Sequence, residues 1–469
     1  MLSGTAGWLL TVGALVVFGW IGIRAGSRLR RSDDDNYLTA RGTQGTVALG
    51  LNFFASVLGA WILFAPPEVG TFGGILGIVG YAVGQAVAIA IFAYVGPRIR
   101  ARMPTGTTVL EFVRARFGNV THTYVGGISV LYMFVFLAAE LTAVGGAVSL
   151  LSGADRLIPI IAVAAVTAIY TAYGGLPASL ATDRWQGVLI LALVAAAAVG
   201  IAVDVSGPGE RATAAGLGSA TQTGLELFIV LVIAITAANL FHQGFWQRVW
   251  AARDDRSLVR GAWLGGGLVI PVLFVAGLLG MVAAGGGEID VPSLALFTLF
   301  EELPAALVAL VIILAVTLVA SSVDTLQNAL AALITVDVSR GRLRLGGARL
   351  ATLALTVPAA VLATENISVL RLFLVADLLA ATIALPVFLG LWRRITTLGT
   401  LVGCATGLIA VVAAGWILDG SIVDGFKLVT LPDGAALAPF VAAIAGSLLA
   451  TLAVSWVAGP RRTRGAPAA

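Results

Sequence analysis

Thirteen apolar stretches divide this chain, and each is close to the length that a helix needs to cross a lipid bilayer. They cover residues 8–23, 47–64, 75–95, 124–151, 158–172, 187–203, 225–241, 261–284, 305–336, 350–363, 369–391, 398–418 and 438–457. A bilayer crossing takes about 20 mostly apolar residues, and a helix satisfies its own backbone hydrogen bonds there. The pattern predicts an all-α, multi-pass membrane protein with one transmembrane domain over residues 1–469.

The composition excludes several other classes of protein. Charged residues make up 11% of the 469 residues, whereas soluble domains carry about 25%. The single cysteine is Cys404, and the two histidines, His122 and His242, lie far apart in the sequence. No catalytic triad, nucleotide-binding loop or metal motif rises above chance. We therefore expect no enzyme activity and no cofactor.

Basic residues gather in alternate loops between the apolar stretches. With the N-terminus outside, only Arg156, Arg211, Arg371 and Lys427 of the 28 basic residues fall outside the inward loops, which include Arg248. The positive-inside rule then predicts an odd number of spans and a cytoplasmic C-terminus, in the plasma (inner) membrane. The basic loops do not alternate with aromatic residues, so the net charge of +4 indicates orientation and not nucleic-acid binding.

The ninth stretch carries adjacent hydroxyls where hydrocarbon is expected. It reads Ser321-Ser322-Val323-Asp324-Thr325 in the middle of an apolar segment. Polar side chains at bilayer depth are costly and often mark ion or substrate paths. A single Ser in a membrane helix more often bonds back to its own backbone or joins two helices. Two adjacent Ser, followed by Asp and Thr, favour a site for a small alkali cation.

The second stretch predicts a weak or broken helix. It contains Gly59 and is followed by Pro66 and Pro67. Broken helices at membrane depth are tolerated where they line a cavity, and they expose carbonyls that can coordinate a cation. Trp61 lies beside the expected break and is able to cover a small organic solute. A proline kink with an interfacial Trp explains the segment equally well.

Five sequence elements, in order, resemble those of the sodium:solute symporter family. Residues 34–42 are similar to its Asp-Tyr-Leu-x-Ala-Gly-Arg element, and residues 107–118 to its Thr-x-x-Glu-Phe-x-x-x-Arg-Phe-Gly loop. Residues 170–187 resemble its most recognisable stretch, and residues 245–253 its Gln-Arg-x-x-Ala-Ala-Lys element. Residues 321–325 are similar to its Ser-Thr-x-Asp-Ser core.

The resemblance implies a leucine-transporter-like fold of five plus five helices in inverted repeats, here residues 47–203 and 225–391. It also implies a sodium ion between the second and ninth spans. Carried over by position, the ligands are the carbonyls of Ala55, Leu58 and Leu318 and the hydroxyls of Ser321 and Ser322. Asp183 matches a family acid near the inner route of the ion, although a helix cap explains it equally well. Asp324 is placed on the same path.

Two positions depart from the family pattern. Val57 stands where the proline symporters carry an Asp, which argues against proline as the solute. Glu140 stands where a Gln is expected, and an ionisable group there costs a few kcal/mol or stays protonated. Glu140 can bind a cationic substrate group, carry a coupling proton, or pair with a hydroxyl in a purely structural role. Glu68 and Asp377 are further acids that solvated span ends explain.

We expect a secondary transporter that imports a small polar organic solute with sodium by alternating access. The residues expected to line its substrate site are Gly59, Trp61, Tyr132, Phe136, Glu140, His242 and Gln243. Proton-coupled symport through Glu140 is one alternative, and a transport-like membrane sensor is another. The expected partners are the sodium ion, the solute and the lipid bilayer. The sequence names neither the solute nor the oligomeric state.

Overall fold

The computed structural model describes residues 2–27, 34–340, 342, 345–365, 367–420 and 437–459. The first half forms α1 (Gly4–Gly26), α2 (Asp34–Thr39), α3 (Thr46–Val57), η1 (Ala60–Leu63), α4 (Ala65–Arg102), α5 (Val109–Phe117), α6 (Asn119–Ser152), α7 (Leu157–Asp204) and α8 (Pro208–Ala214). Within these ranges the β structure is one isolated bridge between Gln44 and Ala252. The prediction of an all-α protein is confirmed.

The second half continues the helical pattern. It forms α9 (Gln222–Asn239), α10 (Gln243–Ala251), α11 (Asp255–Ala284), η2 (Pro292–Leu294), α12 (Ala295–Leu299), η3 (Phe300–Glu302), α13 (Ala305–Ala332), η4 (Leu333–Val338), α14 (Leu345–Leu362), η5 (Ala363–Glu365), α15 (Val369–Phe388), η6 (Leu389–Leu391), α16 (Thr397–Asp419) and α18 (Leu437–Ala458). The η4 segment is a π-helix that extends α13.

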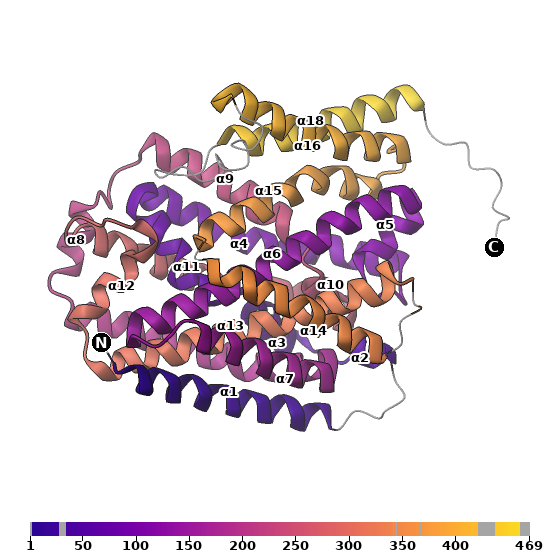
Figure 1. Ribbon diagram of the computed structural model, residues 1–469. Helices are drawn as coiled ribbons and strands as arrows, with labels where there is room; N and C mark the ends of the chain where they lie inside the picture. Colours follow the sequence, from indigo (N-terminus) through magenta and orange to yellow (C-terminus); the bar gives the residue numbers. More distant parts are fainter. Residues whose placement is uncertain are drawn as a thin grey trace.

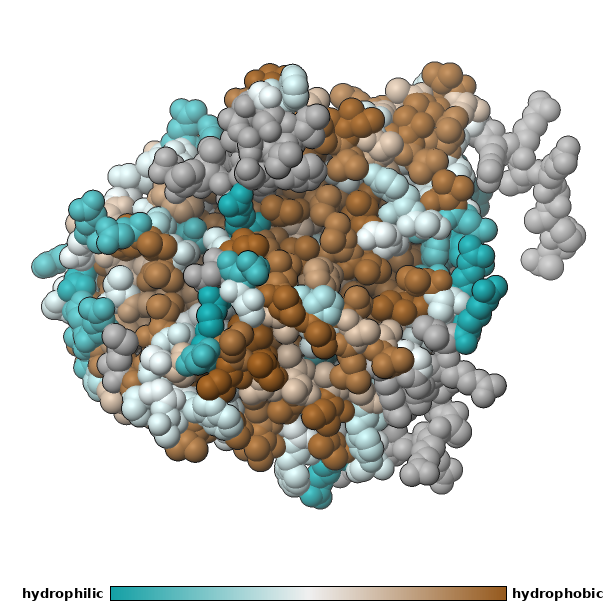
Figure 2. All heavy atoms as spheres, in the orientation of Figure 1, coloured by the Kyte–Doolittle hydropathy of each residue, from teal (hydrophilic) through white to brown (hydrophobic). Residues whose placement is uncertain are grey.

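The long helices lie side by side along one direction, with α1 at one edge and the α16–α18 pair at the opposite edge (Figure 1). Between them, α13 packs on α6 and α7, and α15 packs on α6 and α9. Hydrophobic side chains cover much of the middle of the face shown in Figure 2, and hydrophilic ones gather toward its left and right ends. This distribution is that of a protein whose helices cross a bilayer.

Ten described helices are long and apolar enough to cross a membrane. The fifth and sixth predicted spans are two helices within α7 that meet at Gly175, whose backbone is non-helical with φ of 58°. Tyr37 packs so closely there that a side chain at Gly175 would overlap it. A similar break at Gly74 lies inside α4. Glycine tolerates this left-handed conformation without strain. The multi-pass topology is confirmed, and the count of thirteen spans stays a prediction.

Two helices are interrupted deep in the protein. α3 ends at Val57, and the backbone of Leu58 and Gly59 is extended before η1 begins. α9 ends at Asn239, and α10 begins only at Gln243. Pro66 and Pro67 lie in the first turn of α4, where proline starts a helix instead of breaking it. The predicted break is confirmed at Gly59. These are the first helices of the two expected repeats, and the repeat assignment itself stays a prediction.

α6 and α15 run antiparallel, and this arrangement positions the site. At one end, Arg116 just before α6 donates to the Gly390 carbonyl just after α15, at 2.9 Å. At the other end, Ser149 near the end of α6 and Val369 at the start of α15 line the same pocket. The end with Arg116 is rich in arginine, because residue 41, residues 98–116 and residues 390–395 meet there. We call it the arginine-rich end.

Candidate functional site

The carboxylate of Glu140 lies against the break in the second predicted span. It is fully buried on α6. Its Oε2 accepts a hydrogen bond from the Ala60 amide at 3.0 Å, and its Oε1 accepts one from the Ser322 hydroxyl at 2.6 Å. A methyl group at Gly59 would overlap this carboxylate, so only glycine permits the close approach. One carboxylate thus joins the broken helix, α6 and α13.

The neighbouring hydroxyl, that of Ser321, binds a different carboxylate. It donates to Oδ1 of Asp183 on α7 at 2.6 Å. Arg248 on α10 donates from Nη2 to Oδ2 of Asp183 at 2.6 Å, and both side chains are fully buried. Asp183 lies well inside α7, so the alternative that it caps a helix at the membrane edge is wrong.

Arg248 lies in the protein interior, and its predicted place in an inward loop is wrong. Its guanidinium also donates to the carbonyls of Asn52, at 3.2 Å, and Gly244, at 2.7 Å, and to the Thr325 hydroxyl at 3.0 Å. A buried charge persists when it is paired and its remaining donors are satisfied. Arg248 and Asp183 meet this condition and join α3, α7, α10 and α13.

Asp324 is bound by neutral donors from α7. Tyr170 donates at 2.6 Å, Ser179 at 2.7 Å and Thr182 at 3.1 Å. Asp324 and all three donors are buried. These bonds fix the register of α13 against α7, one turn of helix away from the Ser321–Ser322 pair.

The hydroxyls of Ser321 and Ser322 bond to other helices. Thr317 and Ser56, in the ninth and second predicted spans, bond back to carbonyls of their own helices, those of Ile313 and Asn52, at 2.6 Å each. Neither member of the Ser pair does so. The explanation that the pair bonds to its own backbone is therefore wrong, whereas the alternative that such hydroxyls join two helices fits both bonds.

The other predicted sodium ligands lie in the same buried region. Ala55 and Leu58 lie at the end of α3 and Leu318 lies on α13, all fully buried, and these two helices pack together. Hydroxyl, carbonyl and carboxylate oxygens are hard ligands of the kind that small hard cations prefer. The chemistry of these groups fits a sodium ion.

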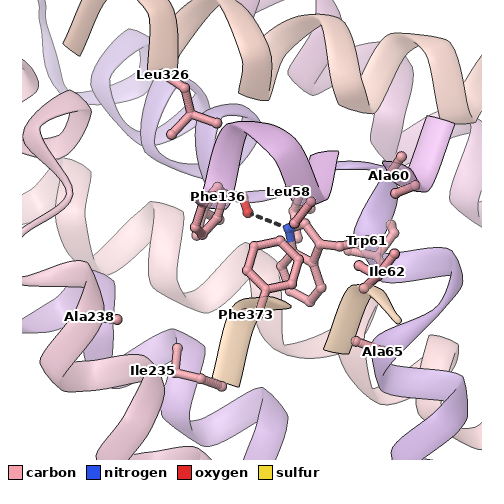
Figure 3. Close-up of a cluster of buried hydrophobic side chains, with 14 of the residues drawn as sticks. Leu58, Ala60, Trp61, Ile62, Ala65, Phe136, Ile235, Ala238, Leu326 and Phe373 are labelled. Carbon is pink, nitrogen blue, oxygen red and sulfur yellow. Dashed lines mark hydrogen bonds between the residues drawn. The ribbon is translucent and has the colours of Figure 1, made fainter. Parts of the chain in front are cut away.

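Aromatic rings gather beside the same break (Figure 3). We define the aromatic cluster as Trp61, Tyr81, Tyr132, Phe136, His242 and Phe373. The ring centroids of Phe136 and Phe373 are 4.5 Å apart, those of Trp61 and Phe373 5.9 Å, and those of Trp61 and Tyr81 5.4 Å. The structure thereby brings Trp61, Tyr132, Phe136 and His242, all predicted substrate-site residues, into one group.

Two members of the aromatic cluster have buried polar atoms without partners. The Tyr132 hydroxyl and both ring nitrogens of His242 make no hydrogen bond within the described part of the chain. A buried polar group without a partner costs about 1–3 kcal/mol. Such groups indicate a place where water or a polar solute binds.

Gln243 has a different place from the one expected of a substrate ligand. Its Nε2 donates to the Thr107 carbonyl at 2.8 Å, and its Oε1 accepts from the Val109 amide at 3.2 Å. Both ends of its side chain hold the start of α5. The structure therefore does not bring Gln243 to the aromatic cluster.

Sequence reasoning missed Phe373 and misplaced one acid. Asp377 lies in the middle of α15 and is only 6% exposed. Glu68 lies in the first turn of α4, and its Oε2 is buried without a partner. The explanation as a solvated span end is wrong for Asp377, whereas Glu68 lies at a helix start and is partly exposed. A signal was available for α15, because Phe373 and Asp377 are four residues apart in an apolar segment and share a helix face.

A pocket of about 450 Å³ opens at the arginine-poor end of the protein. Its lining includes Phe64, which follows the broken helix, and Thr142, two residues beyond Glu140. The ring of Phe64 also contacts that of Phe297 in a tilted arrangement, with centroids 4.9 Å apart. We name this pocket the vestibule.

Comparisons with known proteins agree with this geometry. The family model described as "Sodium:solute symporter family" matches residues 37–407. The chain is 32% identical over 438 residues to the spermidine transporter of Candida albicans, covering 90% of this chain and 84% of that protein. It is 26% identical over 173 residues to sodium/myo-inositol cotransporter 2 of Mus musculus, covering 36% of this chain and 25% of that protein.

Solved structures show the same fold. A sodium-coupled sialic acid symporter in a substrate-bound outward-open state has a TM-score of 0.77 at 19% identity, covering 97% of this chain and 98% of that one. MhsT in complex with L-phenylalanine has a TM-score of 0.56 at 15% identity, covering 88% of this chain and 98% of that one. The chain therefore belongs to the sodium:solute symporter family and is a multi-pass membrane transporter of a solute, with a leucine-transporter-like fold.

Proposed function

We propose that this transporter couples the inward movement of sodium to the import of a small organic solute that carries an amine. The observation that carries the proposal is the Ser321–Ser322 pair. Its two hydroxyls bind two different buried carboxylates, Asp183 and Glu140, beside a broken helix. Asp183 lies on the expected path of the ion, and Glu140 lies beside the aromatic cluster.

The sodium part of the proposal rests on the oxygen ligands around Ser321. Sodium bound by the Ser hydroxyls and the carbonyls of Ala55, Leu58 and Leu318 would bridge α3 and α13. That bridge would order the broken helix, and with it the Ala60 amide that binds Glu140. Coupling requires sodium to bind one conformation better than another, and linked sites typically differ by about 1–3 kcal/mol.

The amine part of the proposal rests on Glu140 and the aromatic rings beside it. Glu140 accepts hydrogen bonds from neutral donors only, so a substrate ammonium would compensate its charge. The name of the Candida relative makes an amine the first class of solute to test. Aromatic faces also attract ammonium groups, by about 0.5–2 kcal/mol each.

We place the vestibule on the outer side of the plasma membrane, since the arginine-rich end is the expected cytoplasmic side. Solute would pass from the vestibule, beside Phe64 and Thr142, to Glu140. The repeats would then rock around this site to open the arginine-rich end. Import by alternating access follows from this orientation.

Uptake into proteoliposomes tests the proposal. Radiolabelled spermidine is offered with an inward sodium gradient and, separately, with choline in place of sodium. The Ser321→Ala, Ser322→Ala double variant should need at least about 10-fold more sodium for half-maximal uptake, a factor within typical coupling energies. Thr317→Ala is the matched control, because its hydroxyl bonds within α13. Unchanged sodium dependence of the double variant would refute the sodium site.

Proton coupling through Glu140 is a second candidate, and one observation favours it. This fully buried carboxylate has no basic partner among its hydrogen-bonding neighbours. Such a group can be neutralised by a proton as well as by an ammonium. Uptake driven by a pH gradient without sodium, and abolished in Glu140→Gln, would select this candidate over sodium coupling.

A further inference from the structure

We infer that the solute is a linear polyamine in which two ammonium groups, four carbons apart, are bound by two separate carboxylates, Glu140 and Asp377. The inference rests on the proposed amine transport and adds a second recognition site, together with a preferred chain length.

The two acids lie on opposite sides of one aromatic contact. Glu140 is four residues after Phe136 on α6, and Asp377 is four residues after Phe373 on α15. The rings of Phe136 and Phe373 meet at 4.5 Å. Because α6 and α15 run antiparallel, Glu140 lies on the vestibule side of this ring contact, and Asp377 lies on the side of the arginine-rich end.

The separation of the two acids follows from helix geometry. Four residues rise about 6 Å along an α-helix, so carboxylates one turn above and one turn below the ring contact are roughly 11–12 Å apart. Each ammonium nitrogen lies about 2.8 Å from the carboxylate oxygen that it contacts, so contacts at both ends leave roughly 6 Å between the two nitrogens. Three single bonds of an extended chain span about 3.6 Å, so the five bonds between two nitrogens four carbons apart span about 6 Å. A 1,4-diaminobutane unit, alone or as part of a linear triamine, therefore matches the gap.

Both carboxylates lack a cation of the protein's own. Glu140 is bonded to an amide and a hydroxyl, and no described residue donates a hydrogen bond to Asp377. The buried cation Arg248 is already paired with Asp183. Carboxylates at bilayer depth without a counter-charge are costly, so ammonium groups from the solute would relieve that cost at both ends.

The aromatic side chains between the acids suit a hydrocarbon chain with charges at its ends. Trp61, Phe136 and Phe373 offer aromatic faces to methylene groups, and Tyr81 lies within electrostatic reach of Glu140, Asp377 and the third acid, Glu68. In the structure the Phe136–Phe373 contact fills the middle of this path, so one ring must turn aside when the solute binds. Within the described residues no three acidic, histidine or cysteine side chains are close enough together to hold a metal ion. The acids are spaced for an extended organic cation.

Binding to the purified transporter in sodium tests the inference. Spermidine, 1,4-diaminobutane and n-butylamine compete with radiolabelled spermidine for wild type, Asp377→Asn and the exposed-acid control Glu210→Gln. Loss of one charge-assisted contact lowers affinity by about 10–100-fold. We expect this loss for spermidine in Asp377→Asn, less than a twofold change for n-butylamine, and no change in Glu210→Gln.

The comparison of the three amines in wild type tests the second site even if Asp377→Asn misfolds. In wild type, spermidine should bind at least 10-fold more tightly than n-butylamine, and Asp377→Glu, which keeps the charge, should keep most of that preference. Equal affinity for the three amines, or an equal loss for all of them in Asp377→Asn, would overturn the second site and leave amine transport standing. Failure of every amine to bind would refute the amine part of the proposed function as well.

Discussion

The buried ion pair of Arg248 and Asp183 gives the sharpest prediction about stability. Replacing Asp183 with Asn keeps the shape of the side chain and an oxygen for Ser321, but it removes the charge that faces the guanidinium at 2.6 Å. Both side chains are completely buried. Breaking a buried pair by removing one partner costs about 3–5 kcal/mol, because an uncompensated charge is left behind.

Thermal unfolding of the detergent-purified protein measures this cost. At about 2 °C for each kcal/mol, the value for larger domains, Asp183→Asn should lower the melting temperature by roughly 5–10 °C. Arg248→Gln should have a similar effect. The double variant should be less destabilised than the sum of the two, with an interaction energy of about 0.5–3 kcal/mol.

The exposed pair of Arg211 and Glu302 is the matched control. Its atoms are 2.8 Å apart, and the hydrogen bond from Arg211 holds the pKa of Glu302 below its ordinary value. Exposed pairs contribute little to stability, so Glu302→Gln should leave the melting temperature nearly unchanged. If Asp183→Asn shifted the temperature no more than Glu302→Gln, or if the two interior substitutions were additive, the buried pair would not hold these helices together.

Three further substitutions probe the site. Gly59→Ala should abolish solute binding while keeping expression, because the added methyl group displaces the Glu140 carboxylate; wild-type affinity by scintillation proximity would contradict this. Tyr170→Phe removes the 2.6 Å bond to Asp324 and should cost about 1.5–3 kcal/mol, read as a lower melting temperature, and an unchanged temperature would be inconsistent with that bond. Gln243→Ala should leave spermidine affinity within twofold but raise amide hydrogen exchange in α5, whose first turn it holds; a large loss of affinity with unchanged exchange would return Gln243 to the substrate site.

Much of the fold could be predicted from the sequence, because the bilayer imposes strong rules on composition and length. The break at Gly59 was predicted from Gly and Pro at apolar depth, and the pairing of the second and ninth spans from the resemblance to the family. The turns between neighbouring spans were harder to predict, because a single non-helical glycine, Gly175 in α7 and Gly74 in α4, joins two helices there. A positive φ at glycine leaves no mark in hydropathy.

The site could be predicted only where residues are close in sequence. Ser321 and Ser322 stand out because they are adjacent polar residues in an apolar run. Arg248 gave no such signal, since an arginine near a span end is ordinarily a loop residue, and its partner is 65 positions away. The spacing of Phe373 and Asp377 places them on one face of α15, but it does not show that this face packs on α6.

The adjacent positions of Ser321 and Ser322 offer a physical basis for coupling two solutes. Successive residues on a helix point about 100° apart, so the two hydroxyls reach different neighbours, Asp183 on α7 and Glu140 on α6. Arg248 compensates Asp183, and no basic residue in the described part of the chain is hydrogen-bonded to or paired with Glu140, Asp324 or Asp377. A sodium ion binds a lone pair of the Ser322 oxygen, so the hydroxyl can keep its hydrogen bond to Glu140 and link the ion to the carboxylate that binds the ammonium group. On this argument, sodium should increase amine affinity in wild type and should have a much smaller effect in Ser322→Ala, where the linking hydroxyl is absent.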